Sequence, residues 1–132
     1  MAMFPVDTNI LVVDDMLTMR KLVIKSLKEM GFSKFVEATN GAEAYEKLSQ
    51  GEAIQLVISD WNMPQTSGLD LLKRVRAESK TAQLPFIMVT AEAEQGQIVE
   101  AVQAGVSNYL IKPFTTDALK EKLQAVAAKL GL

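Results

Sequence analysis

Short aliphatic runs alternate with amphipathic helical patterns five times along this chain, and no other feature limits its fold as strongly. The expected strands cover residues 9–14, 35–38, 54–59, 84–90 and 108–111, and the expected helices cover residues 17–31, 40–51, 67–79, 97–105 and 115–131. Alternating strands and helices are typical of a parallel sheet that is covered by helices on both faces.

The number of these units predicts the topology. Five strand–helix units in 132 residues favour an α/β fold of the flavodoxin-like, doubly wound (βα)5 type, a parallel five-stranded sheet of order 2-1-3-4-5. A chain of this length suits one domain, so we expect residues 1–132 to form a single domain with no separate output domain. Residues 1–8 precede the first strand and are expected to form a mobile tail.

Composition excludes several kinds of site and partner. The chain has no Cys and no His, which removes thiolate nucleophiles, disulfides, imidazole bases and the usual transition-metal ligands. With 14 basic and 16 acidic residues, it lacks the positive charge that nucleic acid or an anionic membrane would attract. No signal peptide or membrane-spanning run is visible, so we expect a cytoplasmic protein. We also expect it to be a monomer.

Polar side chains stand where four of the expected strands end. Asp14 and Asp15 follow the first strand, Asp60 the third, Thr90 ends the fourth, and Lys112 follows the fifth. In open α/β sheets, ligands bind beyond the carboxyl ends of the strands, near the point where the strand order reverses. The five side chains are therefore expected to meet at one edge of the sheet.

Each of these residues also has a purely structural interpretation. Asp14 or Asp15 could cap the following helix, Asp60 could open a turn, Thr90 suits a strand, and Lys112 could be a solvated surface lysine. Five such coincidences at one edge are much less plausible than a shared site.

Three neighbouring carboxylates repel one another, and one of them would take up a proton unless a cation were bound. Because only oxygen ligands are available, the matching ions are Mg²⁺ and its substitutes Mn²⁺ and Ca²⁺. An aspartate beside such an ion is a plausible nucleophile towards phosphorus, and Lys112 could neutralise another oxygen. The pattern predicts a Mg²⁺ site beside a phosphorylatable Asp60.

Five motifs occur in an order and spacing that point to one family: VVDD at 12–15, DWNMPQTSGLDLL at 60–72, VTAEA at 89–93, YLIKPFT at 109–115 and LKEKL at 119–123. By these motifs the chain resembles bacterial two-component response-regulator receiver domains, and most closely the single-domain chemotaxis regulators. The resemblance covers nearly the whole chain. It implies that Asp60 is the phosphoacceptor. It also implies that Asp15, Asp60 and the backbone carbonyl of Asn62 ligate Mg²⁺, with Asp14 acting through a metal-bound water.

The resemblance also implies roles around the phosphoryl group. Lys112 would contact it, Thr90 would hydrogen-bond it, and the rotamer of Tyr109 would follow activation. Asn62 and Glu92 would tune hydrolysis of the acyl phosphate. The bond between Lys112 and Pro113 would be cis.

Two further residues lie close to Asp60 in the sequence. Trp61 is expected to be a partly exposed reporter rather than a catalytic group. Gly68 either supplies a turn with positive φ or is a flexible loop glycine; residue type alone does not separate these two interpretations.

Together these features predict a phosphorylation-activated switch, not an enzyme beyond catalysis of its own phosphorylation and dephosphorylation. The implied partners are a chemotaxis-type histidine kinase, the flagellar motor switch protein and a phosphatase. Glu94 and Gln95 stand where well-known chemotaxis regulators carry lysines, which leaves a phosphate sink or a non-motor partner as the alternative. A small phosphatase that works through an aspartyl phosphate is a further alternative.

Overall fold

In the computed structural model, which describes residues 2–50, 53–91 and 95–132, five parallel strands form one sheet. The strands are β1 (Asn9–Val13), β2 (Lys34–Ala38), β3 (Leu56–Asp60), β4 (Phe86–Thr90) and β5 (Asn108–Ile111), in the order β2-β1-β3-β4-β5. The strand order and the parallel pairing confirm the predicted topology.

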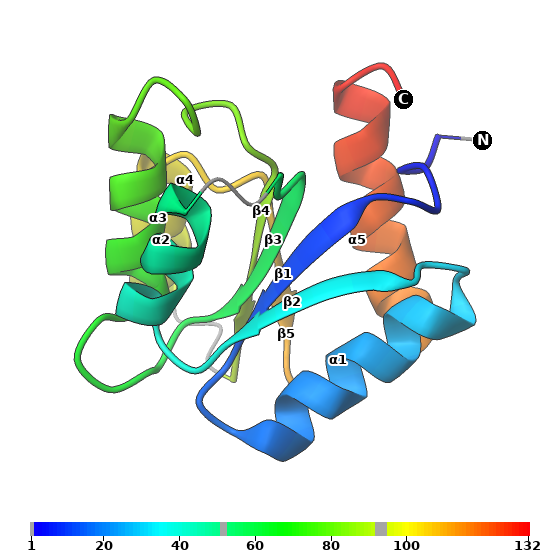
Figure 1. The fold of residues 1–132 in the computed structure, drawn as a ribbon, viewed down its shortest axis with the longest axis horizontal. Coiled ribbons are helices and arrows are strands. Elements are labelled where there is room, and N and C mark those ends of the chain that lie inside the picture. The colour runs from blue at the N-terminus through cyan, green and yellow to red at the C-terminus, as the bar shows by residue number, and fades with distance from the viewer. Residues whose placement is uncertain (1, 51–52, 92–94) are drawn as a thin grey trace.

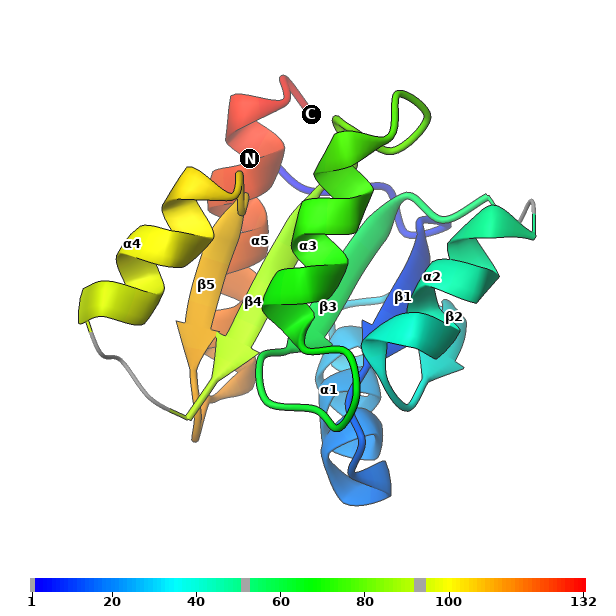
Figure 2. The same cartoon turned by 90° about the vertical axis from the view of Figure 1, so that its left-hand side faces the viewer.

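Helices cover both faces of this sheet, as the alternation predicts (Figure 1). They are α1 (Leu17–Glu29), α2 (Gly41–Ser49), α3 (Gly68–Ala77), α4 (Gln95–Gln103) and α5 (Thr116–Lys129). Helices α1 and α5 lie on one face, and α2, α3 and α4 lie on the other (Figures 1 and 2). Among the described residues, no helix combines the length and apolarity that crossing a membrane requires.

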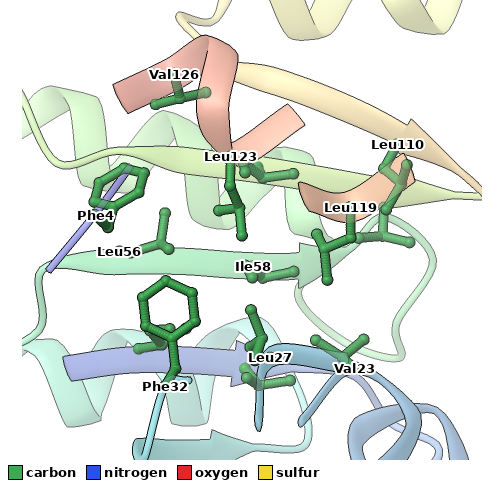
Figure 3. Packing of buried hydrophobic residues seen from close by; sticks show 14 of the residues in the cluster. Phe4, Val23, Leu27, Phe32, Leu56, Ile58, Leu110, Leu119, Leu123 and Val126 are labelled. Atoms are coloured by element: carbon green, nitrogen blue, oxygen red, sulfur yellow. The ribbon is translucent and has the colours of Figure 1, made fainter. Parts of the chain in front are cut away.

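The core has two halves because successive strand side chains point to opposite faces of the sheet. In β1, Ile10 and Val12 join the cluster beneath α1 and α5, whereas Leu11 and Val13 join the cluster beneath α2, α3 and α4. Figure 3 shows the first cluster, in which Leu27 of α1 and Leu123 of α5 meet Ile58 of β3. Both faces of the central strands are therefore buried, which explains their continuous aliphatic sequences.

Three apolar residues that the helical pattern places inward are exposed: Leu22, Val102 and Leu130, with 46%, 60% and 50% of their surface accessible. Each of these helices meets the sheet along a narrower stripe than the sequence pattern suggests. In α1 that stripe is centred on Val23 and Leu27, and Leu22 points away from it.

Two residues of the amino-terminal segment, which is expected to be a mobile tail over residues 1–8, pack against the rest of the protein. Phe4 is 5% exposed and packs in the cluster beneath α1 and α5 (Figure 3). Thr8 is also buried, and its backbone N–H donates to the carbonyl oxygen of Pro5 over 3.0 Å. The aromatic ring fills the open end of the core between the sheet and α5, so hydrophobic burial holds the segment in place.

Candidate functional site

Three carboxylates meet at the carboxyl edge of the sheet. Asp14 directly follows β1, and Asp60 is the last residue of β3. Because Val13 and Ser59 are paired across these neighbouring strands, the two acids leave the sheet side by side. With Asp15, each offers a carboxylate oxygen, and these three oxygens lie within 4.8 Å of one another. Asp14 and Asp60 are buried, at 4% and 6% exposure, whereas Asp15 is exposed.

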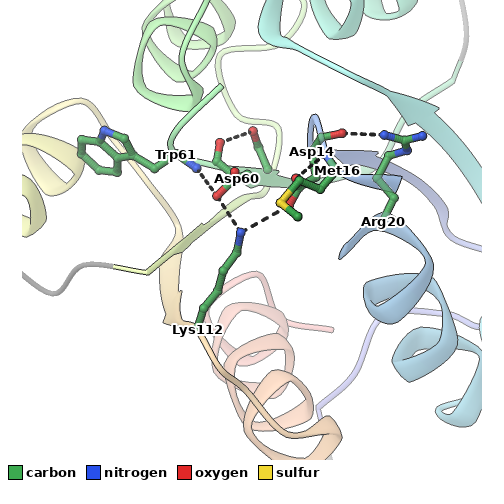
Figure 4. Close-up of polar contacts among 7 residues, drawn as sticks. Asp14, Met16, Arg20, Asp60, Trp61 and Lys112 are labelled. Atoms are coloured by element: carbon green, nitrogen blue, oxygen red, sulfur yellow. Dashed lines mark hydrogen bonds and ion pairs between the residues drawn. The ribbon is translucent and has the colours of Figure 1, made fainter. Parts of the chain in front are cut away.

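Lys112 joins this cluster from the far side, just beyond β5 (Figure 4). Its ammonium nitrogen lies 3.0 Å from Oδ1 of Asp60 and 3.4 Å from Oδ2 of Asp14. Its backbone N–H donates to the carbonyl oxygen of Thr90 over 2.8 Å, which ties the end of β5 to the end of β4. The bond between Lys112 and Pro113 is cis, in agreement with the resemblance.

Neither Asp14 nor Asp15 caps helix α1. The N-cap residue is Met16, and no side chain caps the helix. Oδ1 of Asp14 instead accepts the backbone N–H of Met16 over 2.9 Å, a local turn that holds the carboxylate at the sheet edge. The capping interpretation of the acid pair is therefore wrong, and both acids remain for the site.

Two donors that the sequence analysis missed fix the buried acids. The backbone N–H of Trp61 donates to Oδ1 of Asp60 over 3.0 Å. Arg20 of α1 donates to the carbonyl oxygen of Asp14 over 2.8 Å (Figure 4). Arg20 also pairs with Glu37 over 3.0 Å. No motif distinguishes Arg20 from the solvated lysines of the same helix, so only its tertiary contacts reveal this positioning role.

Burial and charge set the protonation of the site. Burial raises the pKa of Asp60 above its ordinary value; the hydrogen bond from Lys112 opposes this, and the charge of Asp14 adds to it. Burial lowers the pKa of Lys112, but its hydrogen bond to Asp60 and the charges of both acids outweigh that effect, and the net change is a rise. One ammonium thus faces three carboxylates. The surplus negative charge and the all-oxygen ligand set fit a hard divalent cation such as Mg²⁺.

Thr90 and Tyr109, the two expected switch residues, lie at opposite ends of their strands. Thr90 ends β4 at the site edge and is 3% exposed. Tyr109 is half-buried near the start of β5 and packs against the cluster beneath α2, α3 and α4. The ammonium nitrogen of Lys122 lies 5.2 Å from the centroid of the Tyr109 ring.

The loop after Asp60 differs from expectation at two positions. Trp61 is buried, at 8% exposure, because its ring packs in the cluster beneath α2, α3 and α4. Gly68 does not have positive φ. It is needed for close approach instead: a Cβ there would overlap the backbone oxygen of Asp60 and lie 2.8 Å from the sulfur of Met88.

The remaining site predictions concern the loops. Asn62 is exposed in the segment between β3 and α3, two residues beyond Asp60. Glu92 and Glu94 lie outside the described residues, and Gln95 is the first residue of α4.

Replacing the exposed acid should separate metal binding from folding. Asp15→Asn is expected to weaken Mg²⁺ binding by about tenfold or more. It should leave the melting temperature of the metal-free protein unchanged or higher, because it relieves repulsion with Asp14 and Asp60. Thermal unfolding with and without Mg²⁺ measures both effects. Asp7→Asn, an exposed acid before β1, is the control. A lower melting temperature of Asp15→Asn in EDTA would contradict the proposed repulsion.

Known proteins are similar to this chain in sequence and in fold. The model of the response regulator receiver domain family matches residues 10–124. Chemotaxis protein CheY1 of Helicobacter pylori is 45% identical over 118 residues, covering 89% of this chain and 95% of that protein. The CheY homolog of Campylobacter jejuni is 46% identical, covering 89% and 91%. The structure of Vibrio cholerae CheY4 superposes with a TM-score of 0.83 at 32% identity, covering 91% of this chain and 98% of that one.

Proposed function

Because this chain belongs to the response regulator receiver family and is homologous to CheY chemotaxis regulators, we propose that Asp60 is its phosphoacceptor. The observation that carries this proposal is the contact between a buried Asp60 and Lys112, at 3.0 Å, beside two further acids. A carboxylate at the end of a central strand, with a cation on one of its oxygens, is suited to attack phosphorus and to hold the product.

The proposed reaction transfers a phosphoryl group from a phosphohistidine of a histidine kinase. A carboxylate oxygen of Asp60 forms a bond to phosphorus while the bond from phosphorus to the imidazole nitrogen breaks, and the electron pair of that bond returns to the imidazole. Lys112 is already within 3.0 Å of Asp60, so its charge is in place to stabilise the oxygens of the transferred group. The N–H of Trp61 orients the carboxylate.

The proposed cofactor is Mg²⁺, held by Asp14, Asp15 and Asp60 together with the backbone carbonyl of Asn62. The closeness of the three carboxylate oxygens supports this assignment. When bound, the ion supplies the positive charge that the carboxylates lack and that a phosphoryl group needs. The N–H of Met16 bonds the carboxylate of Asp14, and Arg20 bonds its backbone carbonyl oxygen. These two hydrogen bonds would fix the position of Asp14 beside the ion.

Phosphorylation is proposed to act as a switch because it places new charge and strong acceptor oxygens on Asp60. Thr90, buried at the end of the neighbouring strand β4, would then bond the phosphoryl group. Its displacement would open space for the ring of Tyr109. Asn62 and Glu92 are proposed to set the rate at which the acyl phosphate hydrolyses.

The proposed output is protein contact in chemotaxis control of the flagellar motor, since the relatives from Helicobacter pylori and Campylobacter jejuni are named chemotaxis proteins. The kinase would be of the chemotaxis type, and a phosphatase would reset the signal. Glu94 and Gln95 keep open the alternative of a phosphate sink or a non-motor partner, because they replace lysines of well-known chemotaxis regulators and so remove positive charge.

Titration with a peptide from the flagellar switch protein separates these outputs. Mg²⁺ and beryllofluoride, which mimics the phosphoryl group, should first change the fluorescence of Trp61, because its backbone N–H bonds Asp60. For a motor-directed regulator, the activated protein should bind the peptide about tenfold more tightly than the unactivated protein. An activated protein that binds the peptide no better than the unactivated one would remove the motor as target and leave the phosphate sink or another partner.

A further inference from the structure

A buried side-chain oxygen in α4 lacks a hydrogen-bond partner. It is Oε1 of Gln97, and within the part of the chain that the structure describes it is the one buried side-chain nitrogen or oxygen atom in this condition. A buried acceptor that has lost water without gaining a donor destabilises the conformation that holds it. Native proteins satisfy nearly all such atoms, so this one requires an explanation.

The place of Gln97 on α4 indicates which groups could reach it. Gln97 lies one helical turn before Ala101, which is 1% exposed, so both residues belong to the side of α4 that faces the sheet. Ala101 belongs to the cluster beneath α2, α3 and α4, and Tyr109 packs against the same cluster. Figure 2 shows α4 at the β5 edge of the sheet, and β5 carries Tyr109. A ring that turns from β5 towards α4 therefore approaches Gln97.

The contact between α4 and the sheet is made by small side chains. Ala101 is the one fully buried residue of α4 among those described, and Ala104 packs beside it. Val99 and Val102 point outward, with 45% and 60% of their surface accessible. Helix α3, by contrast, buries leucines and a valine against the same face. Because alanines fill less volume, α4 can accept an aromatic ring from β5 more readily than α3 could.

Tyr109 has the donor that Gln97 lacks. A tyrosine hydroxyl donates one hydrogen bond, and that of Tyr109 makes none with the residues that the structure describes. The ring is half-buried, and the ammonium nitrogen of Lys122 lies 5.2 Å from its centroid. The two groups are therefore complementary: one is an acceptor without a donor, and the other is a donor without an acceptor.

We infer that Gln97 accepts the hydroxyl of Tyr109 in the activated protein and so helps to hold the ring in its inward rotamer. This inference rests on the proposed function, in which displacement of Thr90 opens space for the ring. The unpaired oxygen of Gln97 destabilises the unactivated protein, and the new hydrogen bond removes that cost on activation. Gln97 thereby shifts the equilibrium of the switch towards its activated state.

Gln97→Met tests the inference, because methionine has a similar shape but only a weak acceptor. Without beryllofluoride, the variant should melt about 3 °C above the wild type, since it removes an unpaired buried oxygen. Its affinity for beryllofluoride in Mg²⁺, measured by Trp61 fluorescence, should fall about fivefold, since the unactivated state gains stability and the activated state loses a hydrogen bond. Gln103→Met, at an exposed position of the same helix, should change neither quantity.

Tyr109→Phe separates this role from a purely structural one. In that background the hydroxyl is absent from both states, so Gln97→Met stabilises both states equally. Adding it should still raise the melting temperature, but should leave the affinity for beryllofluoride within about twofold of the Tyr109→Phe value. A further fivefold loss would show that Gln97 pairs with another donor and would overturn the inference.

The other outcomes are also decisive. An unchanged or lower melting temperature of Gln97→Met would show that the oxygen carries no cost in the unactivated protein. A higher melting temperature with wild-type affinity would show that activation brings no new bond to Gln97. Either result would overturn the inference while the proposed function stands. A wild-type protein that binds no beryllofluoride in Mg²⁺ would instead overturn the proposed function, and this inference with it.

Discussion

Asp60→Asn is expected to abolish the Mg²⁺-dependent phosphorylation of this protein by acetyl phosphate. The amide keeps the shape of the side chain and can still accept the N–H of Trp61, but it lacks the charged oxygen that attacks phosphorus. Intact mass spectrometry measures the outcome directly. The wild-type protein should gain about 80 Da, the mass of one phosphoryl group, and the variant should gain nothing.

Asp70→Asn is the matched control, because Asp70 is an exposed acid in the first turn of α3. It should be phosphorylated like the wild type. An adduct of the same mass on Asp60→Asn would exclude Asp60 as the phosphoacceptor. Asp14 and Asp15 would then be the next candidates for that role. Far-UV circular dichroism of the variant checks that any loss does not come from unfolding.

Gly68→Ala is expected to have the largest effect on stability. The added Cβ would overlap the backbone oxygen of Asp60, and it would lie 2.8 Å from the sulfur of Met88. Backbone at the end of β3 cannot move away without disturbing the sheet, so the free energy of unfolding should fall by about 3 kcal/mol or more. Mg²⁺ affinity should fall as well, because any relaxation displaces Asp60. Urea unfolding with and without Mg²⁺ gives both quantities.

Gly96→Ala is the control for this substitution. Gly96 lies in α4, its φ is not positive, and a Cβ there would meet no atom within 4 Å. Alanine is the better helix former, so this variant should be as stable as the wild type or up to about 1 kcal/mol more stable. If Gly68→Ala unfolds at the same urea concentration as Gly96→Ala, the loop after β3 accommodates a side chain and the close-approach explanation is wrong.

Much of the fold follows from local patterns. The aliphatic runs ending at Asp14, Asp60 and Thr90 are strands in the structure, and the predicted order of the five strands is confirmed. This succeeded because strands of a parallel sheet are buried on both faces and separated by helices, which leaves a strong periodic signal. Parallel strands also share one carboxyl edge, so the meeting of Asp14, Asp15, Asp60 and Lys112 could be predicted from strand ends alone.

Other features depended on partners distant in the sequence. Phe4 is anchored because the far end of the core is open beside α5, and Leu22 is exposed because α1 meets the sheet along Val23 and Leu27. Arg20 donates a hydrogen bond to the backbone carbonyl oxygen of Asp14, and no sequence motif indicates this contact. Such contacts depend on how helices pack against the sheet, which a local pattern does not contain.

Local sequence patterns are enough to predict the (βα)5 architecture and the meeting of the acids and the lysine at one edge of the sheet. Periodicity and the direction of parallel strands dictate both. Three features could be seen only in the folded protein: Asp60 is buried against Lys112, Gly68 must lack a side chain, and an apolar groove between Leu22 and Phe114 opens beside the site. These features arise where separate elements pack together, and their distances are set by contacts between residues far apart in the chain.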